Sequence, residues 1–351
     1  MNKIFIETID RGDGKKLYLY SQNKANYKTF SGLPPVEGNQ THLRFHPTRS
    51  EWVAYSTSRQ NRTFLPNAME CPLCPMDTEE KPSDIPVDQY EVAIFTNRFS
   101  SLRMEETHVP ELEISTQSAT GTCDVISYSS NHKDQFSELS QERIELILKA
   151  VAHRSKELLN NSHIEYVLPF ENKGKEIGVT IEHPHGQIYS FGHLPEAIKR
   201  QSENQIQNPL LETIAQIPKE LILHENTSGI CFVPRWARYP FEIWVVPHRR
   251  VSQVYDLDDE EIKNLSRLLL ESSKMLDKVF DEPMPYTLAW QLAPKGYQDS
   301  HHLHWCFQPI KRSKTKLKYL AGVEQITGFY LVDLPPERSA RILRGEEQPD
   351  E

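Results

Sequence analysis

The chain has 351 residues and a net charge of −9, with 40 basic residues set against 49 acidic ones. This balance excludes binding to nucleic acid through a broad basic surface. The length is enough for two core-bearing units, because domains usually contain about 100–200 residues. The N-terminus lacks an apolar signal core, and no apolar run reaches the roughly 18 residues that a membrane span needs. We therefore expect a soluble, cytoplasmic protein with no membrane or nucleic-acid partner.

Two arginines follow the first clearly predicted strand, which covers residues 52–56. Arg59 and Arg62 are either ordinary solvated side chains or a clamp for a diphosphate, because guanidinium groups match phosphate oxygens in charge and geometry. Residues 1–45 precede this strand and are largely polar. We expect them to form an N-terminal lead-in to the first unit.

A pair of cysteines comes next, in the stretch Cys71-Pro-Leu-Cys74-Pro. The chain has five cysteines, an odd and sparse set that does not suit a disulfide framework. Two cysteines at this spacing converge readily on one tetrahedral zinc ion, although such a site needs two more ligands. A thioredoxin-like redox site is less favoured because no βαβ pattern follows, and a pair of free cysteines is the simplest alternative.

Strands are predicted over residues 91–99 and 123–128, and a helix from about residue 138 to 159. The first strand ends in a polar turn, and the second runs into His132. Taken alone, His132 is most simply a solvent-exposed turn residue. The helix is predicted from apolar residues at helical spacing, which are Ile144, Ile147, Leu148, Val151, Leu158 and Leu159.

The most informative stretch reads Glu-His-Pro-His-Gly-Gln-Ile and covers residues 182–188. In an extended strand His183 and His185 point to the same side, because side chains alternate with period two. Gly186 removes a side chain, which we interpret as room for a bulky ligand, and the amide of Gln187 binds oxygens but cannot deliver a proton. A neutral imidazole in this setting is a candidate nucleophile for phosphorus. For an arbitrary His-x-His, surface or metal-binding histidines are the alternative.

The second half of the chain echoes the first. Strands are predicted at residues 230–233, 241–246 and 286–290, and a helix begins at the acidic turn that starts with Asp258. His248 follows His132, and His302 follows His183, by nearly equal distances, which predicts a duplicated unit. Since Gly-Gln follows only the first His-x-His, we interpret the second copy as degenerate and without the chemistry.

The stretch Phe170-Glu-Asn-Lys-Gly, with Gly178-Val-Thr180 and the His-Pro-His-Gly-Gln string, closely resembles the galactose-1-phosphate uridylyltransferases. These enzymes are the nucleotidyl-transferring branch of the histidine-triad superfamily. The resemblance implies that His185 attacks the α-phosphorus of UDP-glucose, with Gln187 as its catalytic neighbour. It further implies ping-pong transfer of UMP to galactose-1-phosphate, giving UDP-galactose, in a homodimer.

The resemblance also assigns binding residues. It implies one structural zinc per chain, held by Cys71, Cys74, His132 and His183. The residues that it implies for the nucleotide and its phosphates are Arg59, Arg62, Phe95, Asn97, Phe99, Asn172, Gly178, Thr180 and Gln187. Those that it implies for the sugar and its phosphate are Lys318, Tyr319, Val323 and Glu324.

In well-known members of that family the second His-x-His joins a glutamate and a third histidine around iron. Here the matching positions are Gln201 and Gln291, and neither amide is a good ligand. We therefore expect no second metal at His302 and His304.

We predict an α+β protein of two tandem histidine-triad-like units, each an antiparallel sheet packed by helices. Residues 46–200 carry the nucleophile and zinc site, residues 201–345 form the degenerate unit, and residues 346–351 form a disordered acidic tail. The predicted activity is that of a UDP-glucose–hexose-1-phosphate uridylyltransferase. The alternatives are a nucleoside-diphosphate-sugar phosphorylase, a histidine-triad hydrolase, and a non-catalytic zinc module. In the hydrolases a histidine replaces Gln187 and protonates the leaving group.

Overall fold

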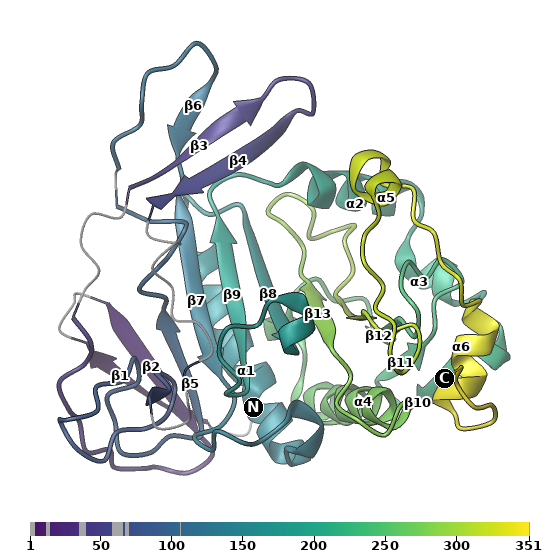
Figure 1. Ribbon diagram of the computed structural model, residues 1–351, viewed down its shortest axis with the longest axis horizontal. Coiled ribbons are helices and arrows are strands. Elements are labelled where there is room, and N and C mark those ends of the chain that lie inside the picture. The colour runs from purple at the N-terminus through teal and green to yellow at the C-terminus, as the bar shows by residue number, and fades with distance from the viewer. Residues whose placement is uncertain are drawn as a thin grey trace.

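The computed structural model describes residues 4–11, 15–34, 40–57, 66, 70–105 and 107–350. Within them, one antiparallel sheet of 11 strands crosses the molecule (Figure 1), in the order β1-β2-β5-β7-β9-β8-β13-β14-β12-β11-β10. One half contains β1 (Phe5–Asp10), β2 (Lys16–Ser21), β5 (Val92–Thr96), β7 (Gly121–Ser127), β8 (Tyr166–Lys173) and β9 (His185–Phe191). The other contains β10 (Ile222–Glu225), β11 (Gly229–Phe232), β12 (Ile243–Pro247), β13 (Tyr286–Gln291) and β14 (His304–Pro309). The predicted α+β class is confirmed.

The two halves of the sheet repeat one arrangement. They meet where β8 pairs with β13, and outward from that pair the strands follow the same sequence, β9-β7-β5-β2 on one side and β14-β12-β11-β10 on the other. Each half has one long helix at the same point, α1 (Gln141–Leu159) between β7 and β8 and α4 (Asp259–Lys278) between β12 and β13. This repeat confirms the duplicated strand–helix–strand unit.

The helices α1 and α4 pack against each other and cover one face of the sheet. Ser140 caps α1 by accepting a hydrogen bond from the backbone N–H of Arg143, and Asp258 caps α4 in a reciprocal pair with Glu261. Their apolar stripes join the sheet in the main core, where each fully buried Leu or Ile contributes about 1.5–3 kcal/mol. Both predicted helices are confirmed.

Residues 5–10 and 16–21 belong to the main sheet, which differs from the lead-in that the sequence suggests. Strand β2 pairs with β1 on one side and with β5 on the other. Tyr18 and Tyr20 face the core beneath α1, while Leu17 and Leu19 face a smaller core around Cys71. Because both faces of β2 are covered, this short strand is integral to the fold.

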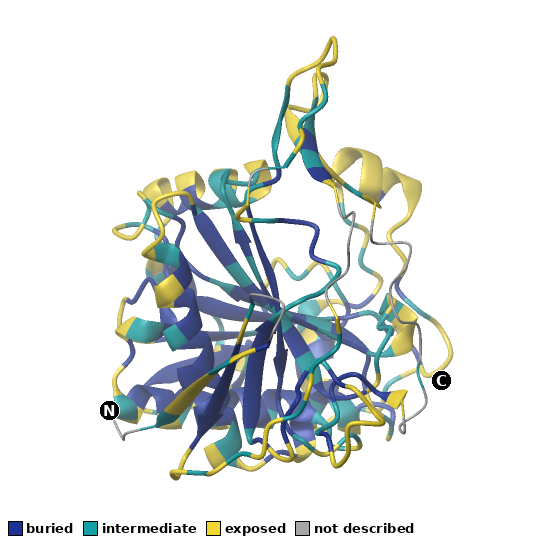
Figure 2. Cartoon of the chain, turned by 90° about the vertical axis from the view of Figure 1, so that its left-hand side faces the viewer, coloured by how far each residue is buried: buried dark blue, intermediate teal, exposed yellow. Residues whose placement is uncertain are grey.

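Smaller elements surround the sheet. A three-stranded sheet of β4 (Glu51–Ser56), β3 (Thr41–His46) and β6 (Thr116–Ser118) projects from the body, with an exposed tip (Figure 2). The remaining helices are α2 (Glu196–Gln207), α3 (Leu210–Ile214), α5 (Gly322–Thr327), α6 (Pro336–Leu343), η3 (Phe136–Glu138), η4 (Lys175–Ile177), η5 (Lys219–Leu221) and η6 (Val254–Asp256). No helix in the described part of the chain is long and apolar enough to cross a bilayer.

The acidic C-terminal residues are ordered against α6, so the prediction of a disordered tail is wrong for the described residues up to 350. Arg338 of α6 pairs with Glu347 and with Asp350, each at 2.7 Å. Arg341 also reaches Glu347, at 2.9 Å. The basic side chains of α6 thus hold the acidic segment in place.

Candidate active site and metal centre

A cavity of about 410 Å³ lies over β5, β7, β9 and β8. The strand register explains why these strands present their side chains together, since Gln187 lies opposite Val125 on β7 and Phe170 on β8, and directly paired residues share a sheet face. Eight of the predicted site residues line this cavity, namely Phe95, Asn97, Phe99, Asn172, Gly178, Thr180, His185 and Gln187.

The imidazole of His185 is held in one orientation and one protonation state. Its Nδ1–H donates to the carbonyl oxygen of His183, 2.7 Å away, which leaves Nε2 with a free lone pair. Burial lowers the pKa of His185 below its usual value. The ring is therefore neutral near pH 7, and Nε2 has the properties of a nucleophile.

Two asparagines supply hydrogen-bond donors around the cavity, and a glycine shapes one of its walls. Oδ1 of Asn172 accepts from Thr287 at 3.1 Å, and Oδ1 of Asn97 accepts from the backbone N–H of Phe99 at 2.8 Å. Neither NH₂ group has a hydrogen-bond partner within the described part of the chain, so both are available to a ligand. Gly178 ends η4 with a φ of +81°, a conformation that strongly favours glycine. This turn shapes the loop that forms one wall.

Aromatic residues that sequence reasoning missed also line the cavity. Tyr189 lies two residues after Gln187 on β9, and Phe170 lies two residues before Asn172 on β8. Their rings meet edge to face, with centroids 5.2 Å apart. Side chains two residues apart on a strand share a face, and this rule placed the polar residues on one face of the sheet. Applied to the residues two positions further along each strand, the same rule would have identified both rings.

The interpretation of Gly186 as room for a ligand is wrong. A Cβ atom at this position would lie 2.2 Å from the hydroxyl of Tyr128 and 2.9 Å from the carbonyl oxygen of Phe170. A side chain at position 186 would face away from the cavity, because those of its neighbours on β9, His185 and Gln187, face into it. Glycine is needed here so that buried protein groups can pack behind the strand.

The four predicted metal ligands converge. The ligand atoms of Cys71, Cys74, His132 and His183 all lie within 4.8 Å of one another. The sulfur of Cys74 is 3.5 Å from Nδ1 of His132 and 3.5 Å from Nδ1 of His183, and donors on a shared tetrahedral zinc are about 3.3–3.8 Å apart. Hydrogen bonding from Cys74, with a smaller contribution from His183, lowers the pKa of the Cys71 thiol below its usual value, against the opposing effect of burial. The cluster could hold a metal ion.

The second ring nitrogen of His183 fixes its orientation toward the cluster. Nε2–H donates to the carbonyl oxygen of Ser129 at 2.7 Å, and the hydroxyl of Tyr90 lies 3.1 Å from the same nitrogen. Tyr90 in turn donates to the carbonyl oxygen of Leu73, between the two cysteines. Such outer partners hold a metal-binding histidine in one tautomer.

The second His-x-His has different surroundings. Nε2 of His302 is 2.9 Å from the carbonyl oxygen of Pro247, and its Nδ1 is 3.0 Å from that of Val251. Nε2 of His304 faces the amide nitrogen of Gln201 at 3.5 Å. Among the described residues, only the Cys71 group brings three or more His, Cys, Asp or Glu side chains close enough to share a metal ion.

The remaining predicted residues lie elsewhere. Arg59 and Arg62 fall outside the described residues. A separate cavity of about 460 Å³ is lined by Lys318, Tyr319 and Glu324, and Val323 is exposed on α5. The ammonium of Lys318 is bonded to Glu324, so the two charged groups predicted to contact the sugar neutralise each other here.

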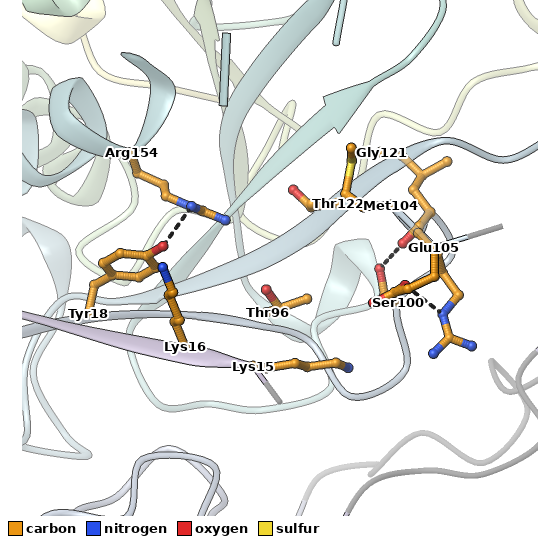
Figure 3. Close-up of a pocket in the computed structure, with 12 residues that line it drawn as sticks. Lys15, Lys16, Tyr18, Thr96, Ser100, Met104, Glu105, Gly121, Thr122 and Arg154 are labelled. Carbon is orange, nitrogen blue, oxygen red and sulfur yellow. Dashed lines mark hydrogen bonds and ion pairs between the residues drawn. The ribbon is translucent and has the colours of Figure 1, made fainter. Parts of the chain in front are cut away.

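A further cavity, of about 280 Å³, lies on the opposite face of β5 and β7 (Figure 3). Its most buried cation, Arg154 of α1, donates to Asp124 at 2.7 Å, to Glu157 at 2.8 Å and to the hydroxyl of Tyr18 at 3.0 Å. Two carboxylates already balance this guanidinium. Because the cavity is across the sheet from His185, we do not assign the nucleotide to it.

Comparison with known proteins gives one consistent family. The sequence matches the profile of the galactose-1-phosphate uridyl transferase N-terminal domain over residues 34–195 and that of its C-terminal domain over residues 189–349. The galactose-1-phosphate uridylyltransferase of Thermotoga maritima is 32% identical over 318 residues, which are 87% of this chain and 98% of the relative. That of Streptomyces lividans is 28% identical over 95% of each chain. A solved uridylyltransferase structure, 26% identical, superposes with a TM-score of 0.77 over 87% of this chain and 97% of that one.

Proposed function

The chain belongs to the galactose-1-phosphate uridyl transferase family, and on this premise we propose that it transfers a uridylyl group from UDP-glucose to galactose-1-phosphate. The observation that carries the proposal is the neutral imidazole of His185, whose Nε2 is free in a cavity lined by amide donors and aromatic rings. The substrates are those that the family implies, and the geometry of the cavity supports the roles that we propose for the individual residues.

In the first half-reaction, Nε2 of His185 attacks the α-phosphorus of UDP-glucose. A P–N bond forms as the P–O bond to glucose-1-phosphate breaks, and glucose-1-phosphate leaves with the bonding electrons. The NH₂ groups of Asn172 and Gln187 stabilise the negative charge that develops on the phosphoryl oxygens. The rings of Phe95, Phe170 and Tyr189 provide apolar and stacking surface for the nucleoside.

In the second half-reaction, a phosphate oxygen of galactose-1-phosphate attacks the same phosphorus, and the P–N bond breaks. The Nδ1 proton of His185 stays on the ring throughout, held by the carbonyl oxygen of His183. The uridylyl-imidazole is therefore cationic, which makes the imidazole a good leaving group without a separate acid. This explains how the cycle proceeds with an amide, which cannot donate an acidic proton, at position 187.

The proposal predicts that Gln187→His slows uridylyl transfer by up to a few hundredfold, or roughly 3 kcal/mol, because an oxyanion donor is lost. The introduced imidazole also provides an acid–base group that can activate water. We therefore expect a larger share of the intermediate to be hydrolysed. The measurement is the amount of UMP formed per UDP-galactose formed, at saturating galactose-1-phosphate, in the wild type and the variant.

Gln187→Asn is the matched control for this experiment. It keeps the amide but shortens its reach, so transfer should fall while the ratio of UMP to UDP-galactose stays close to that of the wild type. A wild-type protein that forms mostly UMP would contradict the transferase and support the hydrolase instead.

We further propose that the metal held by Cys71, Cys74, His132 and His183 is zinc. The donor set of two sulfurs and two imidazole nitrogens suits zinc, and with all four positions filled by protein the ion is structural. Its contribution is to tie the Cys71 loop and the turn at His132 to the residue that orients His185. The chemistry at phosphorus is carried out by the protein side chains.

We also propose that the active protein is a homodimer. The segment around Lys318 does not line the His185 cavity, yet it exposes large apolar side chains, with Tyr319 at 70%, Ile326 at 74% and Phe329 at 67% of their surface. A second copy would cover this surface and could bring the segment to the active site of its partner. Sedimentation equilibrium should give twice the chain mass of 40.7 kDa, and a monomer at micromolar concentration would rule this out.

A further inference from the structure

The C-terminal half of the sheet has a cavity of its own, of about 530 Å³, which lies over His304. This cavity is on the same face of the sheet as the His185 cavity. Asn172, which lines the His185 cavity, is paired with Thr287 on β13, so the two residues share a face. Gln291 lies four residues after Thr287 and therefore on that same face, and it is paired with His304. The two cavities therefore occupy corresponding places in the two halves. Volumes of this size suit small organic ligands.

The ring of His304 is set like that of His185. Its Nδ1–H donates to the carbonyl oxygen of His302 at 2.8 Å, the same bond that His185 makes to His183. Unlike His185, however, His304 has only 1% of its surface exposed. The second half thus keeps the backbone hydrogen bond that orients the histidine, but its histidine is not available to attack a ligand.

Trp244 covers His304. Together with Trp236 it forms an aromatic surface, which we call the aromatic shelf. Trp244 stacks on the imidazole with centroids 4.8 Å apart and 25° between the planes. Its Nε1–H donates to Glu242 at 2.8 Å, which fixes the indole in place, and Trp236 meets its edge with a centroid distance of 5.5 Å. Trp244 on β12 is paired with Cys306 on β14. In the first half, the corresponding pair is Val125 on β7 and Gln187 on β9. An indole thus stands where the first half has an isopropyl group, which adds stacking surface.

The rest of the lining combines apolar side chains, among them Ile198 and Leu210, with polar and basic ones. Arg200 and Arg238 are the charged residues among those that line the cavity, and no described Asp or Glu side chain joins them, in a chain of net charge −9. Helix α2 adds the amides of Gln201 and Asn204, and Asn208 adds another just beyond the end of the helix. Oε1 of Gln291 is buried and has no hydrogen-bond partner among the described residues. These groups suit an anion that carries a hydrogen-bonding planar ring.

We propose that this cavity is a second, non-catalytic binding site for a nucleoside phosphate. The base stacks on Trp236 and meets the ring of Trp244 with its edge, because the two indole planes are 81° apart. It bonds to the amides of α2, while the phosphate is held by Arg200 and Arg238. The inference goes beyond uridylyl transfer and does not rest on it. The site binds without reacting, because His304 is covered and Cys306 stands where the first half has Gln187.

Equilibrium dialysis of radiolabelled UMP against the intact wild-type protein tests the proposal. We expect two molecules of UMP to bind per chain. Gln187→Ala should weaken binding at the His185 cavity, and Trp236→Ala should weaken binding at the second site. Removing a stacking ring should lower the affinity of the second site by about 10-fold or more. Arg200→Gln should also weaken that site, whereas Lys199→Gln, the same charge change one residue away and outside the cavity lining, should not.

The readouts separate this proposal from the proposed function. Trp236→Ala should keep uridylyl transfer within twofold of the wild type, since Trp236 lies in the connection between β11 and β12 and does not line the His185 cavity. A wild type that binds no UMP, or UMP binding that neither Trp236→Ala nor Arg200→Gln weakens, would overturn the inference. Occupation of the second site by galactose-1-phosphate but not by UMP or AMP would overturn it too, because the aromatic shelf would then have no base to bind.

Discussion

His185→Gly is expected to reduce uridylyl transfer by about 10⁴-fold or more, which is the usual scale for loss of an enzyme's nucleophile. The variant lacks Nε2, so no covalent intermediate can form. The backbone pairing of β9 with β7 and β8 remains, and the metal ligands are untouched. The measurement is the exchange of label between UDP-glucose and glucose-1-phosphate without acceptor, together with the gain of one uridylyl group in the mass of the wild-type protein.

His193→Gly is the control for this substitution. His193 is partly buried, follows the end of the same strand, and lies outside the His185 cavity. It should keep near-native exchange, and both variants should unfold at temperatures close to that of the wild type. Near-native exchange by His185→Gly would show that another residue carries the uridylyl group.

Much of the site follows from the sequence because it is built on regular strands. The alternation of side chains along β8 and β9 sets Asn172, His185 and Gln187 on one sheet face. Once the resemblance identified the strands, residues from separate segments could be assigned to one cavity. The duplication was visible for a similar reason, since the same strand–helix–strand order recurs at nearly constant spacing.

Contacts between side chains were not predictable in the same way. The pairing of Lys318 with Glu324 depends on the path of an irregular segment around α5, and no periodic pattern specifies that path. The packing of Tyr128 behind Gly186 depends on the neighbouring strand. The place of β2 in the sheet depends on partners at both edges, including β5, which lies about 75 residues further along the chain.

Cys74→Ser is expected to cost the protein its metal and, with it, both stability and activity. The four ligands come from three separate segments of the chain, so binding free energy at this cluster contributes directly to folding. Replacing a thiolate with a hydroxyl should lower zinc affinity by more than about 100-fold, since even changes in outer partners cost 10–100-fold. We expect metal analysis to show far less than one zinc per chain, and the melting temperature to fall by roughly 5 °C.

Cys231→Ser separates the loss of a metal ligand from the loss of a buried sulfur. The sulfur of Cys231 is fully buried and contacts the hydroxyl of Ser272 at 3.1 Å, far along the sheet from the metal cluster. This control should lose some stability but keep its full metal content and its rate of transfer. In Cys74→Ser the rate should fall further than the loss of folded protein explains, because His183, which orients His185 through its carbonyl oxygen, loses its anchor on the metal side and keeps only its contacts to Ser129 and Tyr90. Full zinc content in Cys74→Ser would show that Cys74 is not a metal ligand. An unchanged rate of transfer by the metal-free protein would show that the metal cluster does not position the nucleophile.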